Sequence, residues 1–284
     1  MFTIERRFES AEALEIFAAE LSLFARPGLV ILLKGDLGTG KSTLARAFIR
    51  ALAGNEALDV PSPTFTLVQS YDETRIPVLH ADLYRLGSAS EVDELGLDDL
   101  LPGHVVLVEW PEKVMDRLWT DVLLVELSGH GEHRVARIAA TGGWVQALKR
   151  NQAINEFIAT TPLAGAQRAF LEGDASFRRY ETLHGAGRSV ILMDMPARPD
   201  GPPVKNGKPY SPIAHLAEDI RAVVAANQQL RHMGYNAPQV EAFDLGAGLA
   251  IIEDLGRAVF GRMTLAGDDM REPMTAAVDV LADM

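Results

Sequence analysis

The segment that most limits the fold of this chain is Gly35-Asp36-Leu37-Gly38-Thr39-Gly40-Lys41-Ser42. Two glycines five positions apart, followed by lysine and serine, form the phosphate-loop pattern. The loop follows Leu29–Leu33, an apolar run typical of a strand buried on both faces. It precedes Lys41–Ala53, whose apolar residues have helical spacing. A strand, a glycine-rich loop and a helix in that order predict a nucleotide-binding core.

Each part of this loop has a physical reason. The glycines let backbone N–H groups approach phosphate oxygens, and the helix N-terminus adds the positive end of its dipole. Lys41 would reach the β- and γ-phosphates, and the Ser42 hydroxyl would ligate magnesium. We therefore expect ATP and Mg²⁺ as cofactors. The predicted nucleotide-binding residues in this segment are Gly35, Asp36, Leu37, Gly38, Thr39, Gly40, Lys41, Ser42 and Thr43.

Further strands are expected along the first half of the chain. Val78–Ala81 and Val105–Val108 are apolar runs that indicate buried strands. Val122–Leu127 and Arg134–Ala140 are joined by a turn-rich segment and favour an antiparallel hairpin. Strands that alternate with helices are typical of an α/β protein. The predicted fold is a P-loop NTPase core with a mostly parallel sheet and a C-terminal antiparallel hairpin.

Two acidic residues stand at the carboxyl ends of predicted strands. Asp82 follows one buried run and Glu109 follows the next. In open α/β sheets ligands lie at that end, so either carboxylate could hold magnesium or orient an attacking water. Either one alone could instead be a simple strand-end cap. Pro61–Thr66 is a proline-containing loop with hydroxyl side chains, suited to a switch segment that contacts the γ-phosphate.

Composition excludes several classes of protein. Asp plus Glu total 39 against 27 Lys plus Arg, giving a net charge of −12, which disfavours autonomous nucleic-acid binding. The absence of cysteine excludes disulfides, thiolate metal sites and cysteine nucleophiles. Apolar runs such as Leu29–Leu33 are far shorter than the roughly 18 residues of a membrane span. We expect a soluble, cytoplasmic protein with no membrane partner.

Five segments occur in order between Ile4 and Ala140: GDLGTGKSTLAR, VPSPTFTLVQSY, HADLYRL, ELGLDDLL and VEWPEK. Together they resemble the TsaE family, the ATPase subunit of bacterial tRNA threonylcarbamoyladenosine biosynthesis. The resemblance implies a slow ATPase that acts with threonylcarbamoyltransferase subunits on tRNA adenosine next to the anticodon. ATP would reset or remodel that partner complex, and the tRNA chemistry would belong to the partners.

The resemblance also implies roles for individual residues. Lys41 would bind the phosphates, and Ser42 would bind magnesium. Thr64 would lie in the switch segment, Asp82 would be the catalytic carboxylate and Glu109 the magnesium-side carboxylate. Trp110, the aromatic residue that follows Glu109, is implied as a further nucleotide-binding residue. For the region that brackets the adenosine end, the resemblance implies Ser10, which also resembles a helix N-cap, and His133 in the loop 131–133.

The implied partners are TsaD- and TsaB-like proteins, with tRNA contacted only through their complex. An acidic surface agrees with docking on protein. The acidic run within residues 91–99 could be such a docking surface, but an ordinary solvated helix face is the more common explanation.

The pattern changes near residue 145, where strands give way to helical spacing from Trp144 to Ile158. We expect a boundary within about 145–160, a P-loop ATPase domain over 1–145 and a second domain over 160–284. The second half contains GDASFRRY at 173–180 and LMDMP at 192–196. We also expect strands in this half, a helix from Ile213 to about Met233 and a hairpin around residue 247. Together, the two motifs and these elements resemble the N-terminal lobe of aminoglycoside-phosphotransferase-like kinases, closest to the amino-sugar branch.

The second half departs from that kinase pattern. Met193 stands where the third strand normally carries a lysine, and no His-x-Asp-x-x-x-x-Asn catalytic loop follows. We therefore predict an α+β partial kinase-like lobe, apparently truncated and catalytically silent. It is either a docking module or part of a longer bifunctional ATPase and amino-sugar kinase. Two alternatives for the first half are a P-loop small-molecule kinase and a nucleotide-gated scaffold without catalysis.

Overall fold

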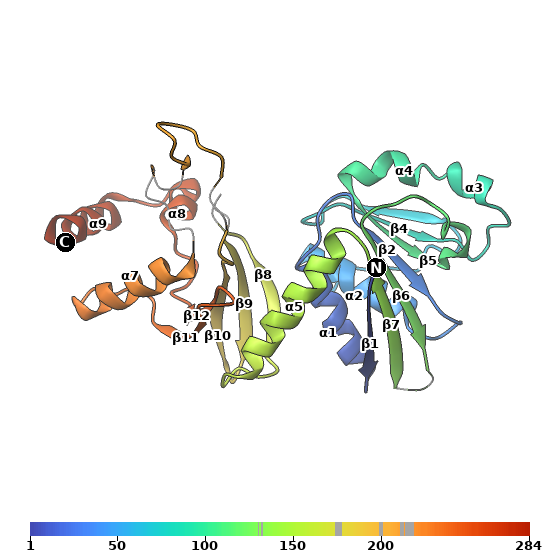
Figure 1. Ribbon diagram of the computed structural model, residues 1–284, viewed down its shortest axis with the longest axis horizontal. Coiled ribbons are helices and arrows are strands. Elements are labelled where there is room, and N and C mark those ends of the chain that lie inside the picture. The colour runs from blue at the N-terminus through green and yellow to red at the C-terminus, as the bar shows by residue number, and fades with distance from the viewer. Residues whose placement is uncertain (130, 132, 174–177, 199–200, 211–212, 214–218) are drawn as a thin grey trace.

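The computed structural model describes residues 1–129, 131, 133–173, 178–198, 201–210, 213 and 219–284. Two β-sheets lie on either side of one long helix, α5, and the α7, α8 and α9 helices lie beyond the second sheet (Figure 1). Four positions of the GDASFRRY motif, 174–177, and positions 214–218 of the predicted helix lie outside the described residues. Among the described residues no helix combines the length and apolarity needed to cross a membrane.

The first sheet has seven strands in the order β1-β7-β6-β2-β5-β4-β3. Its four central strands run parallel and its flanking pairs are antiparallel, which confirms the predicted parallel core with a hairpin. Two edge strands, β1 and β3, were not predicted. The strands are β1 Phe2–Phe8, β2 Val30–Lys34, β3 Val68–Tyr71, β4 Val78–Asp82, β5 Val105–Glu109, β6 Val122–Ser128 and β7 Arg134–Ala140.

Helices cover both faces of this sheet. The α1 (Ala11–Ser22) and α2 (Lys41–Ala53) helices bury apolar residues such as Phe17 and Phe48 against one face. Val92 and Leu97 pack on the opposite face. They belong to short helices within residues 89–103, namely α3 (Ala89–Asp93), α4 (Leu97–Leu100) and η1 (Leu101–Gly103), and a further turn, η2 (Pro111–Lys113), follows β5. Both faces of β2, β4 and β5 are therefore buried, as their continuous apolar runs predict, whereas β6 alternates buried and half-buried residues.

The second sheet is antiparallel, in the order β11-β12-β10-β9-β8. Leu183 and Leu192 face α5, whereas Met193 packs with Ile220 and Val224 of α7 on the other face. An antiparallel sheet with helices confirms the predicted α+β second part. Its elements are β8 Gln167–Leu171, β9 Arg179–Gly185, β10 Arg188–Asp194, α7 Ile220–His232, β11 Val240–Asp244, β12 Leu249–Glu253, α8 Phe260–Ala266 and α9 Arg271–Asp283.

The α5 helix, Gly143–Ala159, belongs to both parts of the molecule. Trp144 and Leu148, in its first half, pack in the core of the first sheet. Ile154 and Phe157, in its second half, pack against the second sheet. The predicted boundary at 145–160 falls within this helix, and the division into 1–145 and 160–284 stays a prediction.

A buried polar network joins the two parts beside α5. Glu20 of α1 accepts hydrogen bonds from the amides of Asn151 and Asn155, at 2.9 and 3.0 Å. Arg168 of β8 donates to the Oδ1 atoms of both asparagines, at 2.5 and 2.8 Å, and forms a bidentate pair with Glu181 of β9. Because every charged member has a partner, the network fixes the second sheet against the first part.

Candidate functional site: a phosphate loop with two carboxylates

The phosphate loop connects β2 to α2 and needs glycine at two places. Gly35 has φ +144°, and a Cβ there would lie 2.3 Å from the carbonyl oxygen of Leu127. Gly40 precedes α2 with φ +105°, and a Cβ there would lie 3.0 Å from Leu14. Any side chain at either position would be strained and crowded. The sequence motif therefore folds into the glycine-dependent loop that it predicts.

Lys41 is buried within this loop. Its Nζ donates to the carbonyl oxygens of Gly35 and Asp36, at 2.7 and 2.9 Å, and lies 3.8 Å from the ring centroid of Trp110. Burial lowers the pKa of Lys41, while the negative charges of Glu109 and Asp82 act in the opposite direction. The ammonium is thus held at the loop by neutral groups, next to two carboxylates that attract it.

Ser42 and Glu109 are joined directly. The Ser42 hydroxyl donates to Glu109 Oε2 at 2.8 Å, although the two residues are 67 positions apart. The other oxygen of Glu109, Oε1, lies 3.0 Å from His80 Nε2. Glu109 and His80 are both buried. Two oxygens fixed by two different partners give this carboxylate a single orientation.

Asp82 organises the proline-containing loop before β3. Its Oδ2 accepts hydrogen bonds from the hydroxyls of Thr64 and Ser62, at 2.7 and 3.1 Å. Its Oδ1 accepts the backbone N–H of Tyr84 at 3.0 Å. Asp82 is 3% exposed, so burial without these donors would be costly. The carboxylate therefore ties the predicted switch segment to the end of β4.

Sheet register explains why these groups meet. Asp82 pairs with Glu109 across β4 and β5, and Glu109 pairs with Leu33 across β5 and β2. The loop after β2 therefore begins beside both carboxylates. A hydroxyl and carboxylate oxygens are hard ligands that fit Mg²⁺, which proteins hold by one or two carboxylates together with phosphate oxygens. The residues present fit the predicted magnesium and nucleotide.

Trp110 follows Glu109 directly and adopts a left-handed backbone, with φ +56°. Its ring centroid lies 4.9 Å from that of Tyr84. The ring therefore contacts both Tyr84 and the Lys41 ammonium. A bulky residue in this conformation is rare, so the surrounding contacts hold it there. Leu37, at the tip of the phosphate loop, is 88% exposed.

Ser10 and His133, the two most weakly predicted site residues, lie at the start of α1 and of β7. The Ser10 hydroxyl accepts the N–H of Ala13 at 3.1 Å, which confirms it as the N-cap of α1. His133 is exposed and lies 2.8 Å from Glu9. Residue 132 of the 131–133 loop lies outside the described residues. A nucleotide-binding role for Ser10 and His133 stays a prediction, as do the roles of Asp36, Leu37 and Thr43.

Two residues at the site escaped the sequence reasoning. Arg134, at the start of β7, donates to the carbonyls of Thr39 and Gly38, at 2.8 and 3.3 Å, and so fixes the peptide units of the phosphate loop. His80 contacts Glu109 from inside β4. His80 stands two positions before Asp82, and alternate residues of a strand share a face, so this spacing predicts that His80 lies on the same side of the sheet as Asp82. Arg134 gives no such local signal.

Three carboxylates of the acidic run at 91–99 are paired with neighbouring side chains. Glu91 accepts from the hydroxyl of Ser88, the N-cap of α3. Asp93 and Asp98 both pair with Arg117. These contacts agree with the ordinary solvated helix face that the sequence favoured.

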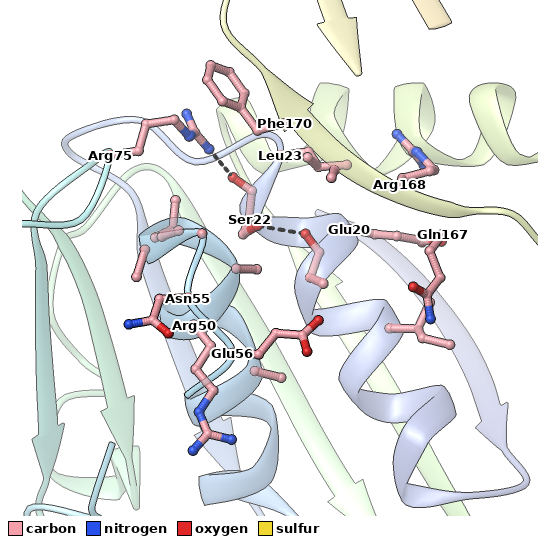
Figure 2. A pocket seen from close by; sticks show the side chains of 18 of the residues that line it. Glu20, Ser22, Leu23, Arg50, Asn55, Glu56, Arg75, Gln167, Arg168 and Phe170 are labelled. Atoms are coloured by element: carbon pink, nitrogen blue, oxygen red, sulfur yellow. Dashed lines mark hydrogen bonds between the residues drawn. The ribbon is translucent and has the colours of Figure 1, made fainter. Parts of the chain in front are cut away.

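A cavity of about 1070 Å³ lies away from the phosphate loop, between α1, α2 and β8. Figure 2 shows Glu20 and Ser22 of α1, Arg50 and Arg75 around it, with Phe170 of β8 above. It therefore lies where the two parts of the molecule face each other.

Comparisons with known proteins agree on the first part of the chain. The family model of the threonylcarbamoyl adenosine biosynthesis protein TsaE matches residues 8–137. A tRNA threonylcarbamoyladenosine biosynthesis protein TsaE from Rickettsia bellii is 37% identical over 127 residues, covering 45% of this chain and 88% of the relative. The TsaE protein of Bacillus subtilis is 34% identical over 133 residues, covering 46% and 82%.

Two further similarities concern a kinase and a solved structure. An N-acetylmuramate/N-acetylglucosamine kinase from Caulobacter vibrioides is 37% identical over 142 residues. The match covers 47% of this chain and only 39% of the kinase, and it is consistent with a kinase-like part fused to the first. The crystal structure of YdiB from Bacillus subtilis covers 54% of this chain and 96% of its own, with 27% identity and a TM-score of 0.45. Through the match at residues 8–137, this chain belongs to the TsaE family.

Proposed function

We propose that the first part of the chain, residues 1–145, binds and hydrolyses magnesium-ATP in support of tRNA threonylcarbamoyladenosine formation. The observation that carries this proposal is the pair of hydrogen bonds from Ser42 to Glu109 and from Thr64 to Asp82. They join the phosphate loop and the predicted switch segment to two buried carboxylates at the same sheet edge. Phosphoryl transfer to water needs this set of groups.

Each residue has a proposed role. Lys41 leaves its carbonyl partners to contact the β- and γ-phosphates, and the loop N–H groups bind the same phosphates. Ser42 and Glu109 hold magnesium, which when bound neutralises charge on the phosphate oxygens. Asp82 orients the attacking water and accepts its proton, and Thr64 keeps the switch segment beside it. Trp110 restricts the position of Lys41, and the adenosine end lies toward Ser10 and His133.

The proposed partners follow from the family. TsaD- and TsaB-like subunits would carry out the tRNA chemistry, and this chain would contact tRNA through them, in the cytoplasm. A net charge of −12 favours docking on protein over gripping RNA. ATP turnover would then reset the partner complex.

The second part is proposed to lack kinase activity. Met193 stands at the position expected for the phosphate-binding lysine and is buried against Ile220 and Val224 of α7. An apolar cluster at this point replaces the usual pairing of a lysine with a helix carboxylate. The kinase-named relative keeps the bifunctional alternative open, because the chain spans only part of that protein's length.

Phosphate release by the purified chain tests the proposal. We expect Asp82→Asn to lower the rate of ATP hydrolysis by about 100-fold, since a lost proton acceptor typically costs that much or more. ATP affinity should change only a few-fold, because Asp82 contacts water and not the phosphates. Asp99→Asn, an exposed aspartate on α4, is the matched control and should retain full activity.

Three results would contradict the proposal or redirect it. Hydrolysis unaffected by Asp82→Asn would remove the assigned role of that carboxylate. A phosphorylated acceptor in place of inorganic phosphate would make the first part a small-molecule kinase. Full tRNA modification with Asp82→Asn and the partner subunits would favour the nucleotide-gated scaffold.

A further inference from the structure

A second cavity, of about 410 Å³, lies at the junction of the two parts and is lined by four arginines. Arg26 follows α1, Arg75 lies between β3 and β4, Arg150 is on α5, and Arg179 begins β9. No acidic residue occurs among the described residues that line it. In a chain with a net charge of −12, four cations from four separate segments form an unusual local excess of positive charge.

Three of these arginines have carboxylate partners that lie behind the lining. Arg26 pairs with Asp121 at 2.9 Å. Arg150 and Arg179 share Asp194, at 2.6 and 3.6 Å. Arg150 also donates to the carbonyl oxygens of Ala247 and Gly248. Arg179 donates to the carbonyl oxygen of Leu23 at 3.0 Å and lies 3.7 Å from Glu181, which leaves it more unused N–H donors than Arg150.

Arg75 differs from the other three. It donates to the carbonyl oxygen of Ser22 at 2.6 Å, and its guanidinium lies 4.1 Å from the ring centroid of Phe170 (Figure 2). No ion pair joins it to a carboxylate among the described residues. Burial lowers the pKa of Arg75, and the positive charge of Arg179 lowers it further. A half-buried cation facing a second cation is stabilised by an anion between them.

We propose that this cavity binds a phosphate group, either free or carried by a small molecule, with Arg75 and Arg179 as its main ligands. Phe170 and Phe24 lie against these two guanidinium groups, at 4.1 and 4.3 Å, and hold their planes in place. A tetrahedral phosphate dianion accepts hydrogen bonds from several directions, which suits arginines that arrive from separate elements. A planar carboxylate would use fewer of them.

The site is distinct from the phosphate loop, so the test must silence that loop. Lys41→Ala provides the background, and inorganic phosphate is the probe, titrated at constant ionic strength against chloride. The measurement is the rise in thermal unfolding temperature, which reports binding to the folded state. We expect phosphate to stabilise Lys41→Ala and the apparent Kd to rise at least tenfold when Arg75→Gln is added.

Arg50→Gln is the matched control, because Arg50 also donates to a carbonyl, that of Leu58, but does not line this cavity. It should leave the phosphate effect unchanged. Arg75→Lys should weaken binding less than Arg75→Gln, since it keeps the positive charge and loses only the planar, two-pronged set of guanidinium N–H donors. Arg179→Gln is the second variant if Arg75→Gln does not fold.

The outcomes separate the possibilities. Equal stabilisation of the Arg75, Arg179 and Arg50 variants by phosphate would overturn the proposal, as would equal stabilisation by chloride. If glycerol 3-phosphate binds as tightly as inorganic phosphate, the site accepts a phosphomonoester. If only inorganic phosphate binds, it holds the free ion. Neither result depends on ATP hydrolysis, so failure of the proposed ATPase activity would leave this site unaffected.

Discussion

The two sheets of this protein bury charge in different ways. In the first part, the buried charges are those of Lys41, Asp82 and Glu109, at the carboxyl ends of the inner strands. Lys41 donates to carbonyl oxygens, and the two carboxylates accept from hydroxyls. In the second part, Arg168 and Glu181 are buried on a sheet face and neutralise each other. Groups of the first kind can exchange their partners for phosphate, magnesium or water. Groups of the second kind are already fully paired and serve to attach one part to the other.

The position of a single cation sharpens this contrast. Lys41 occupies the phosphate-binding position of the first part, and Met193 occupies the corresponding expected position of the second. We expect calorimetry to detect one magnesium-ATP site and Lys41→Ala to weaken it by about 100-fold or more, because the phosphate-contacting charge is lost. Lys149→Ala, an exposed lysine on α5, is the control and should bind normally. Binding that survives Lys41→Ala would place nucleotide in the second part and reopen the bifunctional alternative.

Removal of one member of the attachment pair should affect stability and leave nucleotide binding intact. Arg168→Met leaves Glu181 buried without its bidentate partner, which typically costs about 3–5 kcal/mol of unfolding free energy. Combining it with Glu181→Leu should recover part of that loss, since the uncompensated carboxylate is gone while the side-chain oxygens of Asn151 and Asn155 still lack their donor. Chemical denaturation measures both effects. A change in ATP affinity in the double variant would show that attachment and catalysis are not separable in this way.

The junction also has a pH-dependent contact, at the start of α5. The Gly143 N–H bonds Asp121 at 2.5 Å and is the main cause of a lowered Asp121 pKa, with smaller contributions from Thr120 and Arg26. A lowered pKa in the folded state adds stability above the unfolded value of about 3.9, and that stability is lost as the pH falls through the folded value. Asp121→Asn should therefore be less stable than the parent near neutral pH, by a small margin.

Urea unfolding at several pH values checks this expectation. The difference between Asp121→Asn and the parent should shrink as the pH falls below about 4. A constant difference across the acid range would assign the effect to the side-chain hydrogen bonds alone. Asp99→Asn, on the exposed face of α4, should show no comparable pH dependence.

Local patterns predicted most of the elements, because their causes lie within a few residues. The run at Leu29–Leu33 is apolar throughout, and Ser10 has the hydroxyl that caps a helix. The glycines of the loop after residue 34 adopt backbone conformations that other residues would not fit. In the second part the expected hairpin forms as β11 and β12, whereas the expected helix begins at Ile220 instead of Ile213, because Asp219 is extended and caps it. The carboxylates Asp82 and Glu109 were placed correctly at the strand ends, because parallel strands bring those ends together.

Features that depend on distant partners were missed. β1 alternates exposed and half-buried positions, yet it forms only by pairing with β7, more than 120 residues away in sequence. Arg134 reaches the phosphate loop only because β7 lies beside it. Arg75 is an ordinary loop residue until Phe170 and Arg179 come against it from the second part. Such contacts are set by tertiary packing, and no short-range pattern encodes them.

The shared helix α5 has a consequence for how the molecule loses its structure. Trp144 donates from its indole to the carbonyl oxygen of Val30 in the middle of the first sheet, while Phe157 packs against the second. Melting of either sheet would strip one half of the same helix of its packing. Heat absorption should therefore follow a single cooperative transition, and a protease should find no early cleavage point between the two sheets. The two covalently joined parts are therefore expected to unfold together, as one cooperative unit.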